Sequence, residues 1–312
     1  MDTVIERAYQ LINTPIDSNL RVPFELVDIV DYNEAEPGET VEYFAADSSA
    51  VDGIYEVTDS VLTYHKIGLR DAVAISFTGL NSKLETILLD EIMNSKDQTA
   101  LAVKKDSIIR SMDKDEIRRV LAAIVALDGD TGEANQEVEA ETGDDILRLI
   151  IKMANKITDY ATDSVLLLGA DAYAKYVDYD LDNADNFHFP FPIAAELAKR
   201  GINKIIKVIG ELDTGETGAT QLLDAKLGIL VGRNSNLVKG KPVKMMRRKF
   251  SAEIAARAGA KEGDVRLVNI ADVPQPVNGG NVLGYAVYGY EQLAQVITNY
   301  RALCWSDFTK VL

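Results

Sequence analysis

Cysteine and histidine are scarce in this sequence of 312 residues: Cys304 is the single cysteine, and His65 and His188 are the two histidines. One cysteine cannot form an intrachain disulfide, and it excludes the cysteine clusters that bind soft metals. This cysteine usage is typical of proteins that fold in a reducing compartment. We therefore expect a chain that folds without disulfide bonds.

Basic residues are also fewer than acidic ones: the sequence has 33 Lys and Arg and 49 Asp and Glu, which gives a net charge of −16. A sequence-independent grip on nucleic-acid phosphates needs an excess of bases. We expect any DNA partner to be enclosed and not gripped.

Long apolar runs and a signal peptide are missing as well. No segment approaches the roughly 18 apolar residues of a membrane span, and the first residues lack a basic region followed by an apolar one. The sequence favours a soluble cytoplasmic chain, and its 47% hydrophobic content is sufficient for a sizeable core.

The motifs of common enzymes do not occur. The sequence has no HExxH, GxSxG or GxGxxG pattern, and segment 232–242 imitates a phosphate-binding loop with too long a spacing and a proline in place of Ser or Thr. His65 falls in a predicted hairpin strand and His188 lies between two phenylalanines, so neither indicates a catalytic centre. We predict no enzyme activity, no catalytic residue and no cofactor.

Acidic side chains alternate at Asp178, Asp180 and Asp182, as at the start of a calcium-binding loop. Such a loop expects a bidentate acid further along, where this sequence has Phe189. A solvated acidic loop is the simpler interpretation, and a weak calcium site on the three aspartates is the alternative.

The N-terminal quarter has the composition of extended structure. Residues 1–37 hold three of the eight prolines between short apolar clusters, which predicts an extended arm after a short amphipathic start. From 38 to 79, β-branched and aromatic residues between Asp, Ser and Gly predict a long hairpin. An arm and a hairpin this thin need a partner surface to bury their apolar side chains.

Helical periodicity follows the hairpin. Ser82 and Glu85 have the spacing of a capping box, and apolar residues at helical spacing continue to Met112, which predicts a helix of roughly 28 residues and about 42 Å. Asp113 and Glu116 have the same spacing and predict the cap of a second helix. Eight acids and no base in 128–145 predict a solvated loop, whose last residues cap an amphipathic helix from residue 146.

The rest of the chain divides into a part with alternating strands and helices and a part that is mostly β-like. Predicted strands at 165–168, 202–209 and 227–231 alternate with predicted helices at 171–176 and 193–200, which indicates a compact unit of sheet and helices. Residues 240–312 are mostly β-like.

One segment reverses the overall charge. Its bases, with no acid between them, are Lys239, Lys241, Lys244, Arg247, Arg248 and Lys249. A solvated strand edge, protected from unwanted pairing by like charges, is one interpretation. The other is a contact with the 128–145 loop of a neighbouring subunit, in which Arg247, Arg248 and Lys249 would be the contact residues.

The order of these segments resembles the Hong Kong 97-type major capsid fold of tailed double-stranded DNA viruses. The resemblance rests on the arm, the hairpin, the passage 65–82 that leads from a strand toward a long helix, and the closing segments 288–290, 298–302 and 307–308. It covers nearly the whole chain in the order and composition of the segments, and no single motif is diagnostic. It implies an α+β fold with an N-terminal arm at 1–37, an extended hairpin or E-loop at 38–79, a peripheral domain at 80–144 and 240–312 with a long spine helix, and an axial domain at 145–239.

By this resemblance, the protein is expected to be a phage major head protein that self-assembles through hexamers and pentamers into an icosahedral shell around packaged double-stranded DNA. The expected location is the virion, after assembly in the host cytoplasm. Portal, decoration and separate scaffold proteins are implied partners, the last because the arm follows Met1 almost directly. Some family members link an E-loop lysine to an asparagine of another subunit, for which Lys66 is the candidate here, although non-covalent contacts suffice in most relatives.

Two alternatives stay open. An encapsulin-type compartment has the same fold and encloses protein cargo, so the contents of purified particles would separate it from a viral shell. A soluble α/β binding protein or enzyme built on 145–239 predicts a concave site with acids or bases of shifted pKa, and it leaves the arm, the hairpin and the long helix without a role.

Overall fold

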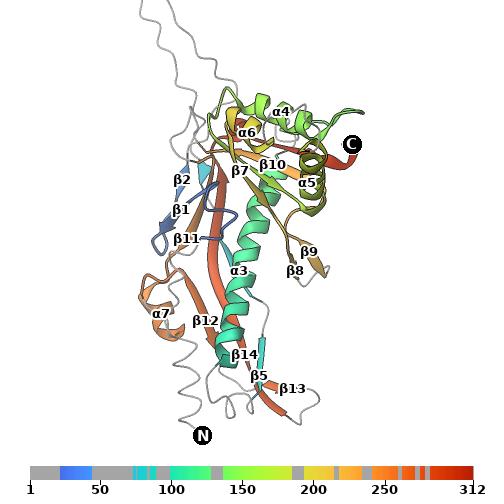
Figure 1. Ribbon diagram of the computed structural model, residues 1–312. Helices are drawn as coiled ribbons and strands as arrows, with labels where there is room; N and C mark the ends of the chain where they lie inside the picture. The colour runs from blue at the N-terminus through green and yellow to red at the C-terminus, as the bar shows by residue number, and fades with distance from the viewer. Residues whose placement is uncertain are drawn as a thin grey trace, which may run out of the picture.

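A computed structural model describes residues 22–43, 73–74, 76–82, 85–88, 99–127, 136–184, 193–213, 218–233, 241–258, 262–270, 275–277 and 282–311. In these ranges the chain forms a long seven-stranded sheet with a long helix beside it and a smaller α/β unit at one end (Figure 1). In that part of the chain, no helix is long and apolar enough to cross a membrane.

The seven-stranded sheet is organised around one strand, β14, which runs from Val282 to Ile297. Along β14, residues 293–297 pair with β11, 287–291 with β12 and 282–284 with β13, while 290–293 pair with β4 and 284–287 with β5. Tyr290 pairs with both Leu267 and Asn81, so β12 and β4 lie on opposite edges. The other strands of this sheet are β1 (Val30–Ala35), β4 (Thr78–Asn81), β5 (Glu85–Leu88), β11 (Val243–Arg248), β12 (Arg266–Ile270) and β13 (Gln275–Val277).

The α/β unit contains a four-stranded sheet in the order β15-β10-β6-β7, in which only β6 and β7 are parallel. Its strands and helices are β6 (Ser164–Leu168), β7 (Ile202–Lys207), β10 (Leu227–Gly232), β15 (Leu303–Asp307), α4 (Ile146–Ile157), α5 (Ala170–Ala184) and α6 (Ile193–Lys199). The chain also forms the antiparallel pair of β8 (Glu211–Asp213) with β9 (Ala219–Gln221), helix α7 (Ala252–Ala258), and the short 3₁₀ helices Tyr300–Ala302 and Phe308–Lys310.

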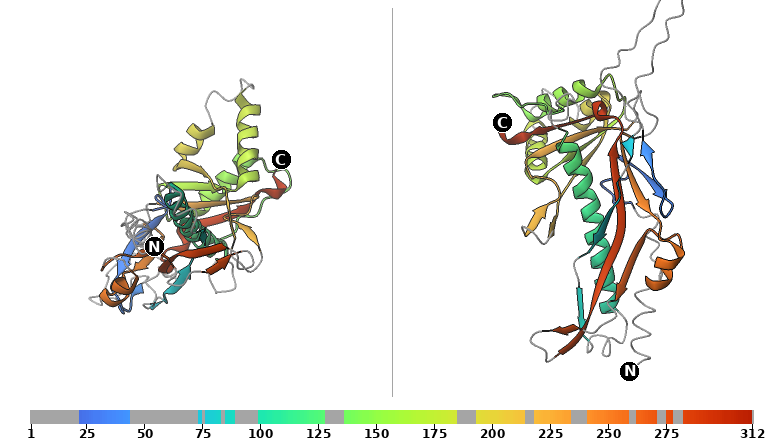
Figure 2. Two further views of the ribbon diagram at one scale, coloured as in Figure 1. Left: turned by 90° about the horizontal axis from the view of Figure 1, so that it is seen from below. Right: turned by 180° about the vertical axis from the view of Figure 1, so that it is seen from behind.

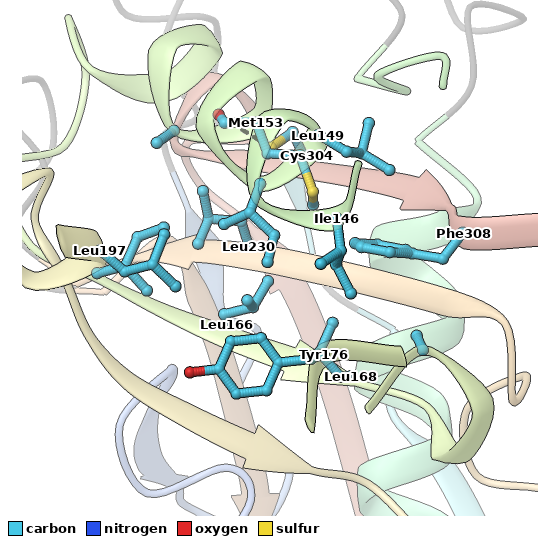
Figure 3. Packing of buried hydrophobic residues seen from close by; sticks show 14 of the residues in the cluster. Ile146, Leu149, Met153, Leu166, Leu168, Tyr176, Leu197, Leu230, Cys304 and Phe308 are labelled. Carbon is cyan, nitrogen blue, oxygen red and sulfur yellow. Dashed lines mark hydrogen bonds between the residues drawn. The ribbon is translucent and has the colours of Figure 1, made fainter. Parts of the chain in front are cut away.

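Both faces of the four-stranded sheet are buried. Leu166 and Leu168 of β6 face the cluster formed with α4 and α5, whereas Val165 and Leu167 face the end of the long helix α3 (Thr99–Val125). This alternation follows from the two-residue period of a strand and explains why the run 165–168 is apolar throughout. Figure 3 shows the first cluster, with Leu149 and Met153 of α4 and with Cys304.

Helix α3 joins the two sheets. Its 27 residues span about 40 Å at 1.5 Å per residue. Ile108 and Met112 pack on β14 beside Gly289, where an added Cβ would lie 2.5 Å from Met112 Sδ and 2.7 Å from Ile108 Cγ2. The missing side chain of Gly289 therefore lets helix and strand approach closely. Toward the other end of the helix, Val120 and Ile124 pack under the four-stranded sheet.

The predicted boundaries of the long helix were wrong at both ends. Residues 85–88 form β5, and Ser82 caps no helix: its backbone N–H donates to Gly289 O at 2.8 Å, and its hydroxyl accepts from Gly289 N at 2.7 Å. Hydrogen bonding of residues 85–88 to β14 therefore decides their structure against the local helical pattern, since tertiary contacts can override helix propensity. Asp113 does not begin a second helix either, because α3 continues through it to Val125.

The arm predicted at 1–37 is wrong for residues 22–35. The chain turns at 23–29 and enters the large sheet as β1, parallel to β11, and Leu26 and Ile29 are fully buried. Part of the apolar surface that suggested a partner is therefore buried in the chain's own core, at Leu26 and Ile29, whereas Phe24 stays 64% exposed. Residues 1–21 lie outside the described ranges.

The hairpin predicted at 38–79 is described only at its base. Glu42–Tyr43 (β2) pairs antiparallel with Val73–Ala74 (β3). Residues 44–72, which include His65 and Lys66, lie outside the described ranges.

Several predicted elements of the α/β unit are confirmed. The apolar face of α4 is buried as expected, and Asp145 is its N-cap residue, whose side chain accepts from Arg148 N at 2.7 Å. The strands at 165–168 and 227–231 are present, and α6 is followed by Gly201 in a left-handed conformation (φ 84°).

Two expectations about this unit need correction. Residues 303–307 do not stay with the preceding β-rich segment, because they return as β15 and pair with β10. The acidic segment 128–145 is not a solvated loop in its second half: Val138 N donates to Trp305 O at 2.8 Å, and the carboxylate of Asp144 is buried against Lys152. Residues 128–135 lie outside the described ranges.

We expect Gly289→Ala to lower the free energy of unfolding by about 1–3 kcal/mol, because the new methyl group overpacks the contact with α3. Chemical denaturation measures the loss. Combining it with Ile108→Ala removes one of the two close contacts, so the double variant should lose less than the sum of the two single losses; strict additivity would contradict this packing.

Cys304 should be inert in the folded protein. Its thiol is fully buried, and burial raises its pKa to about 12, so almost no reactive thiolate forms near neutral pH. A thiol reagent is expected to modify the chain only after denaturation. Rapid modification of the native protein would contradict the described packing of β15.

Candidate functional site

Five charged side chains are buried together between α3 and the large sheet. Asp113 and Glu116 come from α3, Arg247 from β11, Arg266 from β12 and Glu291 from β14. None exposes more than 7% of its surface. Charged residues are almost never this buried unless they are paired, so the cluster is a defined feature of the fold.

Glu116 is held from several sides. Arg247 donates from Nε to Oε1 and from Nη2 to Oε2, both at 2.8 Å, in the bidentate geometry that suits a guanidinium and a carboxylate. The hydroxyl of Tyr32, on β1, donates to Oε2 at 2.9 Å. Burial, together with the charge of Glu116, raises the pKa of Tyr32, which keeps this donor protonated.

Arg266 is the centre of the cluster because its guanidinium meets three carboxylates. Nη1 donates to Asp113 Oδ1 at 2.6 Å, Nε donates to Glu291 Oε2, and Nη2 lies 2.7 Å from Glu116 Oε1. The charges of these carboxylates raise the pKa of Arg266, although burial opposes them as the largest single effect. Through Arg266, strand β12 is tied to both α3 and β14.

Sequence reasoning missed four members of this cluster. Asp113 and Glu116 were assigned to a helix cap, and Arg266 and Glu291 were passed over within the β-like segment 240–312. The available signal was their context: a charged residue within an otherwise apolar strand such as 265–270 indicates either an exposed edge or a buried partner.

The inter-subunit contact predicted for Arg247 is wrong, because its side chain is 3% exposed and bound to Glu116 of the same chain. The predicted solvated edge is also wrong, since β11 lies between β1 and β14. This location explains the burial of its apolar residues Val243, Met245 and Met246.

Arg248 and Lys249 lie closer to the surface and also have partners within the chain. Arg248 Nη2 donates to Glu39 O at 2.9 Å, and its guanidinium lies 3.9 Å from the centre of the Phe77 ring. Lys249 Nζ donates to Glu36 Oε1 at 2.8 Å. Both therefore tie the sheet to the segments that flank the β2–β3 pair. A contact of either residue with another subunit stays a prediction.

The calcium interpretation does not fit the described backbone. Asp178, Asp180 and Asp182 lie on helix α5, not in a loop. Successive helical residues turn by about 100°, so Asp178 and Asp180 point to different sides. In the part of the chain that the structure describes, no group of three or more His, Cys, Asp or Glu residues is arranged to hold a metal ion. His188 lies outside that part.

Sequence comparisons find no relative: no protein-family model matches the chain, and neither does any curated protein. Solved structures do match. The capsid of cyanophage P-SCSP1u superposes with a TM-score of 0.53 at 13% identity, covering 92% of this chain and 88% of that one. The putative capsid protein of a prophage of E. coli CFT073 gives 0.52 at 12% identity, covering 97% and 98%.

A third match is the SrpI encapsulin of Synechococcus elongatus PCC 7942, with a TM-score of 0.51 at 14% identity, covering 98% of this chain and 95% of that one. All three matches extend over nearly the whole of both chains. The protein therefore has the α+β fold of phage capsid proteins, a fold that encapsulins share.

We expect Arg247→Gln to lower the free energy of unfolding by about 3–5 kcal/mol or to abolish soluble expression, because it strips a buried carboxylate of its bidentate partner. Arg248→Gln, the matched change one residue later, should cost no more than about 1 kcal/mol, since its contacts are near the surface. Equal losses in denaturation experiments would contradict the assigned roles.

Proposed function

We propose that the protein is the major capsid protein of a tailed double-stranded DNA virus and that it assembles through hexamers and pentamers into an icosahedral shell. The observation that carries the proposal is the match in fold over 92% and 97% of the chain to a cyanophage capsid and a prophage capsid protein. A match of this extent leaves no part of the chain large enough for a separate catalytic domain.

We assign the parts of the Hong Kong 97-type subunit as follows. The seven-stranded sheet with α3 is the peripheral domain, and α3 is its spine helix. The four-stranded sheet with α4, α5 and α6 is the axial domain, to which β15 contributes although it comes from the end of the chain. The β2–β3 pair is the base of the E-loop, and β1 belongs to the peripheral domain and not to an N-terminal arm.

The elongated form of the subunit supports this assignment. The sheet around β14 and the helix α3 extend well away from the α/β unit (Figure 2). An elongated subunit with different surfaces at its two ends can make head-to-tail contacts that close into rings, as a shell of hexamers and pentamers requires. The described residues serve a structural role, and portal, scaffold and decoration proteins are further partners that we expect.

An encapsulin-type compartment is the second candidate, because the SrpI encapsulin matches the chain about as well as the phage capsids do. The net charge of −16 agrees with the viral candidate, since a wall that binds phosphate tightly would hinder DNA packaging and release, but it agrees equally with a compartment for protein cargo. The enclosed contents decide between the two.

The test is size-exclusion chromatography and negative-stain electron microscopy of the purified chain, alone and with a candidate scaffold. We expect closed shells, tubes or free capsomers. A protein that stays monomeric or dimeric at high concentration under both conditions would overturn the proposal. For particles from the native source, double-stranded DNA inside supports the viral shell, and a defined protein cargo supports the compartment.

A further inference from the structure

The buried cluster contains more negative than positive charge. Three carboxylates, of Asp113, Glu116 and Glu291, meet two guanidiniums, of Arg247 and Arg266. Glu291 differs from the other two carboxylates because its second oxygen, Oε1, is buried with no hydrogen-bond partner among the described residues, while Oε2 accepts from Arg266. A buried ionised oxygen without a donor is costly.

The ionisable groups around Glu291 among the described residues come from four elements, and β4, whose Leu80 pairs with Glu291, has no ionisable residue. Helix α3 contributes Asp113 and Glu116, β11 contributes Arg247, β12 contributes Arg266, and β1 contributes the neutral phenol of Tyr32 through Glu116. Without Glu291, these groups carry two negative and two positive charges. The cluster is therefore neutral only when Glu291 holds a proton.

We propose that Glu291 is a proton-operated lock between helix α3 and the seven-stranded sheet. The protonated carboxyl completes a neutral cluster that holds α3 against β12 and β14. Loss of the proton places an uncompensated charge in this buried contact and loosens it. The lock belongs to the folded subunit, so it does not depend on the proposed shell or on what the shell encloses.

The titration of Glu291 agrees with this geometry. Burial raises the pKa of Glu291 from its ordinary value of 4.5 to about 7; the charge of Arg266 opposes the rise, and that of Glu116 adds to it. Because the pKa is higher in the folded cluster than in water, the folded chain keeps a proton that an opened chain loses between pH 4.5 and about 7. The contact is strongest below pH 4.5, weakens as the pH rises through this window, and is constant above it.

Hydrogen exchange of the full-length chain tests the lock. We expect the protection factors of amides in α3, β12 and β14, which are corrected for the intrinsic effect of pH, to fall by up to about tenfold per pH unit across the window and to level off above it. Glu291→Gln mimics the protonated carboxyl and should keep high protection throughout. Glu211→Gln, on the exposed strand β8, is the matched control and should behave as the wild type does.

Equal pH dependence in the wild type and in Glu291→Gln would overturn the proposal. If Glu291→Gln does not fold, the wild-type chain is labelled with ¹³C-glutamate and the titration of its glutamate carboxyl carbons is followed by NMR. A glutamate signal that titrates well above pH 4.5 supports the lock. If every glutamate signal titrates near pH 4.5, the proposal is refuted. Neither measurement needs particles, so a failed lock and a failed shell proposal are distinguishable.

Discussion

The contact between α3 and the strands around β14 is the constraint on which the rest of the structure depends. The helix can lie this close because Gly289 has no side chain, and Arg266 fixes its position by binding carboxylates from the helix and from β14. Since the far end of α3 also packs under the four-stranded sheet, one rigid element sets the geometry of both sheets. The proposed role as a shell subunit requires such rigidity, because a closed ring repeats the same contact angle at every subunit.

Buried ion pairs are weak contributors to net stability, but removing one partner is expensive. The cluster is therefore better understood as a device that selects one arrangement of helix and sheet than as a source of stability. An apolar contact along α3 would tolerate sliding, whereas the bidentate geometry of Arg247 on Glu116 tolerates little.

Sequence reasoning succeeded where local patterns and tertiary structure agree. The amphipathic face of α4 and the apolar run of β6 were predictable because each has the period of its element. It failed where a distant partner decided the outcome. Residues 85–88 carry a helical pattern but complete the edge of β14, and Arg247 belongs to a basic run but is neutralised by Glu116, 131 positions away. No local window contains that information.

Cryo-electron microscopy of particles formed by this chain, at a resolution that traces the backbone, tests the account most directly. The account predicts a closed shell in which every subunit places α3 along β14, with density for Arg266 between the helix and the strand. Particles whose subunits separate α3 from β14, or a chain that builds no shell in the presence of its scaffold, would contradict it.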